Sequence, residues 1–128
     1  MVLEEPELFS FLKEFYYPDL RMSDTQFSTF DCITEHKKLF IELKSRHTHY
    51  DDLLIEKVKY DAHVGGAKFL GMWPIYICAT PKGIWQFDLS VAQPKWEVRQ
   101  MPKTTEFENN DKINKIVGYI NIKDGAQL

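Results

Sequence analysis

The chain has 128 residues and a net charge of −3, and 44% of its residues are hydrophobic. This length and composition favour one domain over residues 1–128 with a single core, and no run is apolar for long enough to cross a bilayer. Since the N-terminus also lacks a basic and apolar leader, we expect an intracellular, cytoplasmic protein with no membrane partner.

The charges are unevenly distributed along the chain. An acidic balance argues against nonspecific nucleic-acid binding, because phosphate contacts usually come with a basic surface. The acids gather in the first twenty residues, however, whereas the segment from Lys37 to Arg46 holds four cations and a single acid, Glu42. A local basic patch is therefore compatible with the negative net charge of the chain.

The first predicted element is a helix from Pro6 to Tyr16. Proline suits the first turn of a helix, and the glutamates beside it favour the positive end of the helix dipole. The apolar side chains recur at helical spacing and predict the buried stripe, which is Leu8, Phe11, Leu12 and Phe15. The polar segment from Leu20 to Gln26 predicts a loop.

Two strands joined by a short turn are predicted next, over residues 27–33 and 39–46. In the second strand three apolar side chains, Leu39, Ile41 and Leu43, alternate with Phe40, Glu42, Lys44 and Arg46. This alternation is typical of a strand with one buried face. A two- or four-residue turn centred between His36 and Lys37 sets Asp31 opposite Glu42.

The pairing of these two carboxylates needs a physical explanation. Like charges directly opposite one another on neighbouring strands are destabilising unless something neutralises them. A divalent cation that prefers oxygen ligands is the natural neutraliser. Lys44 lies two residues further along the same face, about 7 Å away, and can bring its ammonium group to the same point.

The rest of the chain predicts one further helix and several strands. Residues 50–63 have helical period, and Gly65-Gly66 would end this helix beside the hairpin. The apolar run from Trp73 to Thr80 predicts a central strand. The remaining predictions are a strand over residues 84–89, an edge strand over residues 95–100, a loop over residues 102–111, a last strand over residues 115–122 and a frayed tail over residues 123–128. Cys32 and Cys78 are expected to be free and buried.

An acidic residue on one strand followed by Glu-x-Lys on the next resembles the active-site hairpin of the PD-(D/E)XK nuclease superfamily. Asp31 corresponds to the Asp of that pattern and Glu42-Leu43-Lys44 to its E-x-K, while Phe30 stands where the pattern has Pro. The resemblance is specific over residues 27–46 and looser out to Leu89. Residues 50–59, Tyr-Asp-Asp-Leu-Leu-Ile-Glu-Lys-Val-Lys, are similar to small phage-type members.

The resemblance implies an α/β (α+β) fold with a restriction-endonuclease-like core, in which helices flank a mixed β-sheet. It also implies a hydrolase that cuts DNA with Mg²⁺ or Mn²⁺, held by Asp31, Glu42 and the Leu43 carbonyl. Lys44 would orient or help deprotonate the nucleophile, or stabilise developing charge. A carboxylate of the first helix often completes such a site, and Glu7 and Glu14 are the candidates.

The resemblance further implies phosphate contacts around the site, for which the candidates are Arg46, His47, His49 and Lys59. For Lys59 an ion pair with Glu56 at i,i+3 spacing is an equally good interpretation. The two histidines are a weak zinc signal, because no cysteine or third histidine stands at ligand spacing. His36 and His63 are assigned no function.

A chain this short has no separate domain for reading a sequence, which favours structure-directed or end-directed cutting. Pairing of two chains into a homodimer would allow two strands to be cut. Two other interpretations stay open. One is a catalytically silent relative that binds DNA or a protein, and the other is an interaction or virion-assembly protein in which Lys44 and Glu42 form an ordinary surface pair.

Overall fold

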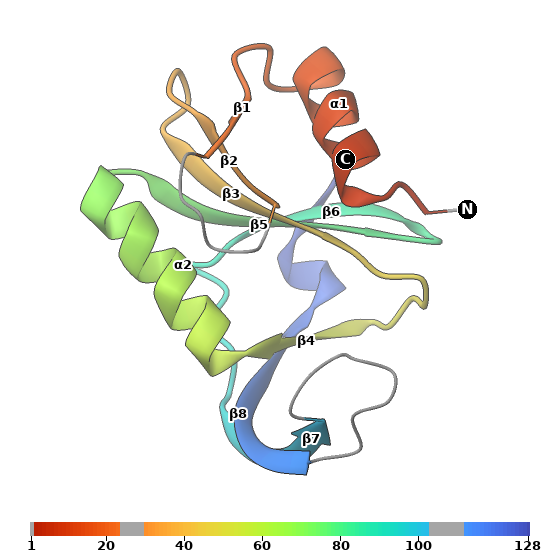
Figure 1. Cartoon of the computed structure of the whole chain (residues 1–128). Coiled ribbons are helices and arrows are strands. Elements are labelled where there is room, and N and C mark those ends of the chain that lie inside the picture. Colours follow the sequence, from red (N-terminus) through yellow and green to blue (C-terminus); the bar gives the residue numbers. More distant parts are fainter. Residues whose placement is uncertain (1, 24–29, 103–111) are drawn as a thin grey trace.

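A computed structural model describes residues 2–23, 30–102 and 112–128 of the chain. The elements of these ranges are α1 (Glu5–Phe15), β1 (Arg21–Met22), β2 (Phe30–Thr34), β3 (Leu39–Ser45), β4 (Asp52–Glu56), α2 (Lys57–Leu70), β5 (Trp73–Thr80), β6 (Gly83–Asp88), β7 (Glu97–Pro102), β8 (Lys112–Asn121), the 3₁₀ helix η1 (Ile122–Asp124) and β9 (Ala126–Gln127). Figure 1 shows their arrangement as a mixed α+β fold.

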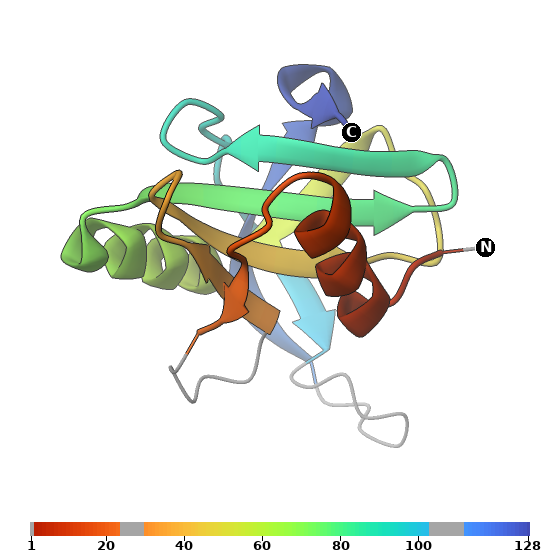
Figure 2. The same cartoon turned by 90° about the horizontal axis from the view of Figure 1, so that it is seen from above.

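The main sheet has six strands in the order β1-β2-β3-β5-β6-β9. The strands β3 and β5 are parallel, and the other neighbours are antiparallel, so the sheet is mixed, as predicted. Seen from above, β3, β5 and β6 run side by side, and α1 lies across them (Figure 2). A second sheet has the order β4-β8-β7.

The predicted hairpin and its register are confirmed. The strands β2 and β3 are antiparallel, residues 35–38 form the turn between them, and Asp31 is the cross-strand partner of Glu42. Lys38 in this turn has a φ of 57°, a left-handed conformation that closes a short turn. Residues 27–29 of the predicted first strand lie outside the described residues.

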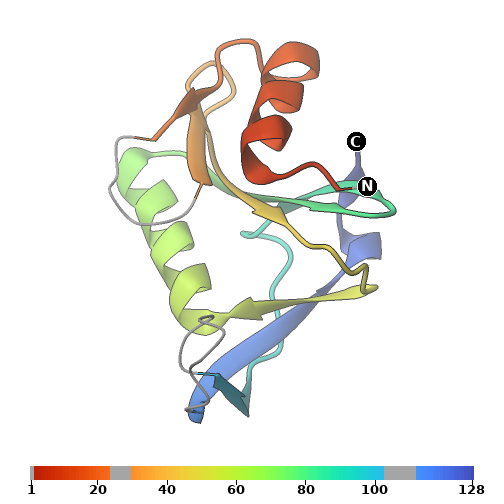
Figure 3. The same cartoon turned by 45° about the vertical axis from the view of Figure 1, so that its right-hand side comes forward.

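The two faces of the main sheet pack against different partners (Figure 3). Ile41 and Leu43 of β3 are buried with Leu8 and Leu12 of α1. The opposite face packs against α2 and the second sheet, through the buried residues Ile33, Phe40, Ala67, Leu53, Ile55, Tyr76, Phe87 and Ile120. The alternation predicted for the hairpin therefore separates two layers of core.

One residue of the stripe predicted for the first helix is not buried. Phe15 is 64% exposed, because it lies in the last turn of α1, where its ring contacts Phe11 at a centroid distance of 5.2 Å instead of the sheet. Within the described ranges, neither helix combines the length and the apolar character needed to cross a membrane.

The helix predicted over residues 50–63 is wrong in both of its limits. Residues Asp52–Glu56 form β4, which pairs with β8, and this pairing buries Leu53 and Ile55 at strand spacing. The helix α2 begins at Lys57 and passes through Gly65 and Gly66 to its end at Gly71, which has a φ of 68°. A Cβ atom at Gly66 would lie 3.3 Å from the Phe40 ring, so this glycine lets α2 approach β3 closely.

Most of the C-terminal half follows the prediction. The strand β5 lies between β3 and β6, as expected for the most apolar run, and β7 is an edge strand. The strand β8 begins at Lys112, three residues before the predicted start. Residues 103–111 of the predicted loop lie outside the described residues.

Two short segments that were predicted to lack regular secondary structure form strands. The predicted loop at residues 20–26 contains β1, which pairs with β2 through Arg21 and Met22; residues 24–26 lie outside the described part. The tail is not frayed, because β9 pairs with β6 and the Leu128 amide donates to the Ile84 carbonyl at 2.9 Å. Leu128 also packs against the core beneath α1.

Candidate metal centre

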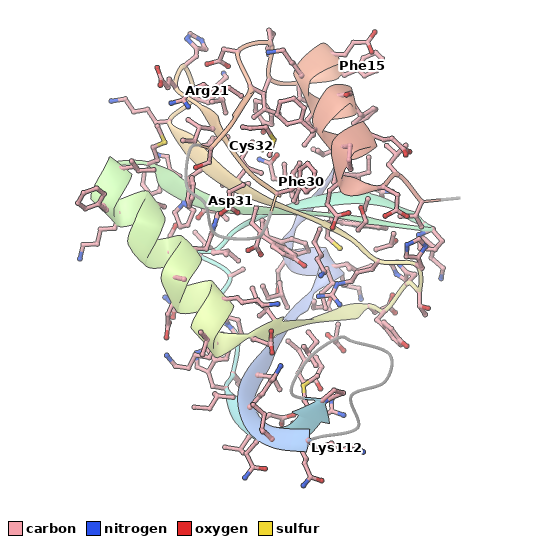
Figure 4. All side chains as sticks on the ribbon, viewed as in Figure 1. Phe15, Arg21, Phe30, Asp31, Cys32 and Lys112 are labelled. Carbon is pink, nitrogen blue, oxygen red and sulfur yellow. The ribbon has the colours of Figure 1, made fainter. Side chains whose placement is uncertain are left out.

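The pair Asp31 and Glu42 lies on the face of the main sheet that α2 covers. Glu42 alternates with Ile41 and Leu43, which face α1, so its side chain points the other way. Figure 4 shows Asp31 between the β2-β3 hairpin and α2. Burial and the charge of Asp31 raise the pKa of Glu42 to about 7. Burial of the carboxyl group is the larger cause, and the repulsion expected between two facing carboxylates adds to it.

His63 of α2 brings a nitrogen to this pair. Its side chain is 4% exposed and stacks on the Phe40 ring at a centroid distance of 4.5 Å. One ligand atom each of Asp31, Glu42 and His63 lies within 4.8 Å of the other two. Burial lowers the pKa of His63, which keeps the ring neutral and able to bind a metal ion.

From the sequence, His63 is expected at the end of a helix and without a function. In the structure it is in the middle of α2, four residues before the fully buried Ala67. This i,i+4 spacing marks the helix face that lies on the sheet. This spacing could have identified His63 as a residue facing the sheet, if the helix had been predicted to continue past the two glycines.

Three cations lie close enough to Glu42 to oppose the rise of its pKa: Lys59, Lys44 and Arg46. Lys44 is exposed, two residues after Glu42 on the same face of β3. The structure therefore brings the three predicted catalytic residues, Asp31, Glu42 and Lys44, to one side of one hairpin. Leu43 has its side chain in the opposite core, so a ligand role is left only to its backbone carbonyl.

Lys59 takes part in the ion pair that was the alternative to a phosphate contact. Its Nζ lies 3.0 Å from Oε2 of Glu56, while Nζ of Lys115 on β8 lies 2.7 Å from Oε1 of the same carboxylate. Burial raises the pKa of Glu56, but the hydrogen bonds from Lys115 and Lys59 outweigh it and lower the pKa overall. Glu56 thus holds two lysines, of which Lys59 also acts on the charge of Glu42 and Lys115 was not predicted.

Arg46 does not lie at the outer border where the sequence analysis expected it. Its Nη2 donates to the Leu54 carbonyl at 2.6 Å and to the Tyr76 hydroxyl at 3.4 Å. Leu54 belongs to β4 and Tyr76 to β5. The guanidinium group of Arg46 therefore connects the two sheets, which is a structural role as much as an electrostatic one.

The structure does not bring the other candidates to the acidic pair. Glu7 and Glu14 lie on α1, which covers the opposite face of the sheet, because Ile41 and Leu43 turn that face toward α1. His47 pairs with Glu4, at 2.9 Å. His49 is occupied at both ring nitrogens, by the Thr80 hydroxyl at 2.8 Å and by the Asp51 carboxylate at 3.0 Å.

The donor set of Asp31, Glu42 and His63 fits one divalent cation. Two carboxylates supply the charge and the oxygen ligands that such ions prefer, and a neutral imidazole suits the transition metals among them. A bound cation would also relieve the repulsion that raises the pKa of Glu42.

No protein-family model, no curated protein and no solved structure matches this chain. What the site does must therefore be argued from its own residues.

Proposed function

We propose that this protein is a metal-dependent deoxyribonuclease with a restriction-endonuclease-like core, which hydrolyses phosphodiester bonds of DNA. The observation that carries the proposal is the cross-strand pair of Asp31 and Glu42, with Lys44 two residues further along the same face. This is the arrangement that the D…E-x-K pattern requires, and it lies on a mixed sheet flanked by two helices.

Asp31 and Glu42, with the Leu43 carbonyl, would hold Mg²⁺ or Mn²⁺. A metal ion in such a site lowers the pKa of a bound water and offsets negative charge at the phosphate. Lys44 stands beside Glu42 with an exposed ammonium group, where it can orient the attacking water or stabilise charge that develops in the transition state.

Lys59 would position a neighbouring phosphate of the same strand. Its side chain is 56% exposed while its ammonium group pairs with Glu56, so it is oriented and still accessible. Contacts of this kind fix the register of the DNA and read no bases. They support a nuclease directed by the structure or the ends of DNA. We further propose an intracellular activity, as in the small phage-type nucleases that residues 50–59 resemble, and a homodimer that would cut two strands.

The test is cleavage of single-stranded, duplex, flapped and four-way DNA with Mn²⁺ and with Mg²⁺. We expect metal-dependent cleavage by the wild type and a loss of at least about a hundredfold in Glu42→Ala and Lys44→Ala. Glu14→Ala and Lys82→Ala are the matched controls, because each removes an exposed charge of the same kind away from the site. Cleavage that survives both site variants would refute the proposal.

The second candidate function is a silent nuclease-fold module that binds DNA or a protein. The observation in its favour is that Arg46 and Lys59 are both engaged in internal contacts, in a chain of net charge −3. Such a module would bind DNA in a gel-shift assay without cutting it. It would also show no rise in melting temperature with Mn²⁺, whereas a metal site stabilises the fold by mass action.

A further inference from the structure

The ring of His63 is oriented by the backbone of the sheet beneath it. Its Nε2 lies 2.9 Å from the Ile75 carbonyl oxygen and 3.0 Å from the Phe40 carbonyl oxygen. A carbonyl oxygen can only accept a hydrogen bond, so Nε2 carries the proton and donates it. In the neutral ring, Nδ1 then holds the free lone pair.

The second observation is the distance between the candidate ligand atoms. Atoms bound to one divalent ion lie about 2.0–2.6 Å from it, so two ligands on opposite sides of the ion are separated by roughly 4–5 Å. One carboxylate oxygen each of Asp31 and Glu42 and one of the two ring nitrogens of His63 lie within 4.8 Å of one another. One ion can therefore contact all three side chains without a rearrangement of β2, β3 or α2.

The third observation is that the residues which orient His63 belong to the strands that form the site. Phe40 stacks on the ring and also accepts its hydrogen bond, and it lies two residues before Glu42 on β3. A histidine that binds a metal ion usually donates its other N–H to a carbonyl or carboxylate, which fixes the tautomer. Phe40 and Ile75 supply this support through their backbone.

We propose that Nδ1 of His63 is the third protein ligand of the metal ion held by Asp31 and Glu42, and that this nitrogen makes the site prefer Mn²⁺ to Mg²⁺. The inference rests on the metal site of the proposed nuclease and adds a ligand and a selectivity to it. Mg²⁺ takes oxygen ligands almost exclusively and retains its waters, whereas imidazole binds the later divalent ions more strongly.

Pulsed electron paramagnetic resonance on the Mn²⁺-loaded wild type tests the ligand directly. We expect nuclear modulation from a directly bound ¹⁴N, replaced by that of ¹⁵N when the histidines alone are labelled with ¹⁵N. The chain has four histidines, so the signal should persist in His36→Gln and His47→Gln, both exposed, and disappear in His63→Gln. Bound Mn²⁺ without histidine modulation would overturn the inference.

Because His63 is buried, His63→Gln can fail to fold, and a second measurement then decides. Nitrogen NMR of the metal-free wild type should show one histidine with its proton on Nε2, and Mn²⁺ should broaden that ring before the others. A proton on Nδ1 of His63 would refute the assignment. Thermal shifts should also give an affinity for Mn²⁺ that is at least about tenfold higher than for Mg²⁺, and equal affinities would refute the selectivity.

The outcomes separate this inference from the proposed function. Metal-dependent cleavage without histidine modulation would support the nuclease proposal and show that His63 is not a metal ligand. Histidine modulation from bound Mn²⁺ without cleavage of any DNA would retain the metal site and refute the nuclease. Absence of Mn²⁺ binding to the folded wild type would overturn both.

Discussion

At the scale of single residues, Glu42 carries an electrostatic cost in the metal-free fold. Its carboxyl group is half-buried and faces another carboxylate, and the pKa rises from 4.5 to about 7 as a result. Nearby cations reduce this rise without cancelling it. A carboxyl group with such a pKa destabilises the metal-free fold when it ionises, and a cation at the proposed site would offset this cost.

This electrostatic cost predicts a pH dependence for the metal-free protein. Below about pH 4.5 the Glu42 carboxyl is protonated in both the folded and the unfolded chain. As the pH rises toward 7 the unfolded chain ionises first, so the free energy of unfolding falls, by about 3 kcal/mol in total. Glu42→Gln removes this loss, and its advantage over the wild type should therefore grow from pH 4.5 to pH 8.

Urea unfolding in the presence of a chelator measures the effect at each pH. Glu14→Gln serves as the control, since it changes an exposed glutamate on α1 and should follow the wild type throughout. If the difference between Glu42→Gln and the wild type does not change with pH, then the pKa of Glu42 is not raised in the folded protein.

At the scale of elements, α2 connects the two sheets and carries His63. It follows β4 directly, and its interior contains two adjacent glycines that would ordinarily weaken a helix. The two differ in their surroundings. Gly65 is exposed, and a Cβ there would meet no atom within 4 Å, whereas a Cβ at Gly66 would lie 3.3 Å from the Phe40 ring.

These surroundings predict opposite results for two neighbouring substitutions. Gly65→Ala should stabilise the fold by about 1 kcal/mol, which is the helix propensity of alanine over glycine. Gly66→Ala should give less than this or destabilise the fold, because the new methyl group presses on the ring that stacks against His63. It should also weaken Mn²⁺ binding, while Gly65→Ala leaves it unchanged. Chemical unfolding and metal titration of both variants check the prediction. Equal gains in stability for Gly65→Ala and Gly66→Ala would contradict it.

At the scale of the whole molecule, Arg46 holds the main sheet and the second sheet together. Its guanidinium group, which lies on the main sheet's inner face, donates to the backbone of β4 and to the Tyr76 hydroxyl on β5. Burial raises the pKa of Tyr76, so this hydroxyl remains neutral and can accept. From the sequence, Arg46 is expected to contact DNA, whereas its place between the sheets predicts that its first effect is on stability.

The corresponding prediction compares two cations. Arg46→Ala removes the donor of the Leu54 carbonyl and should lower the free energy of unfolding by about 1–3 kcal/mol. Lys59→Ala removes an exposed lysine from an ion pair in which Lys115 still neutralises Glu56, and should lower it by less than about 1 kcal/mol. Urea unfolding measures both. An Arg46→Ala variant with the stability of the wild type and weaker DNA binding would restore Arg46 as a phosphate contact.

The register of the hairpin could be predicted because local rules set it. The alternation of Ile41 and Leu43 with Glu42, together with a short turn, is sufficient to pair Asp31 with Glu42, and no distant contact is needed. The same is true of β5, whose apolar run marks a strand that is buried on both faces. The facing carboxylates of the candidate site could therefore be predicted from about twenty consecutive residues.

What lies around that hairpin depends on contacts between distant parts of the chain. Residues 52–56 are a strand because β8, whose Asn121 contacts Asp52 across 69 positions of sequence, supplies their hydrogen bonds; local helical period cannot reveal that partner. Packing also decided that α1 covers the face away from Glu42 and that α2 brings His63 to it. The sequence by itself determined which carboxylates face one another, because strand geometry is local. Only the tertiary structure decided which third side chain meets them, because that requires a helix to be folded back onto the sheet.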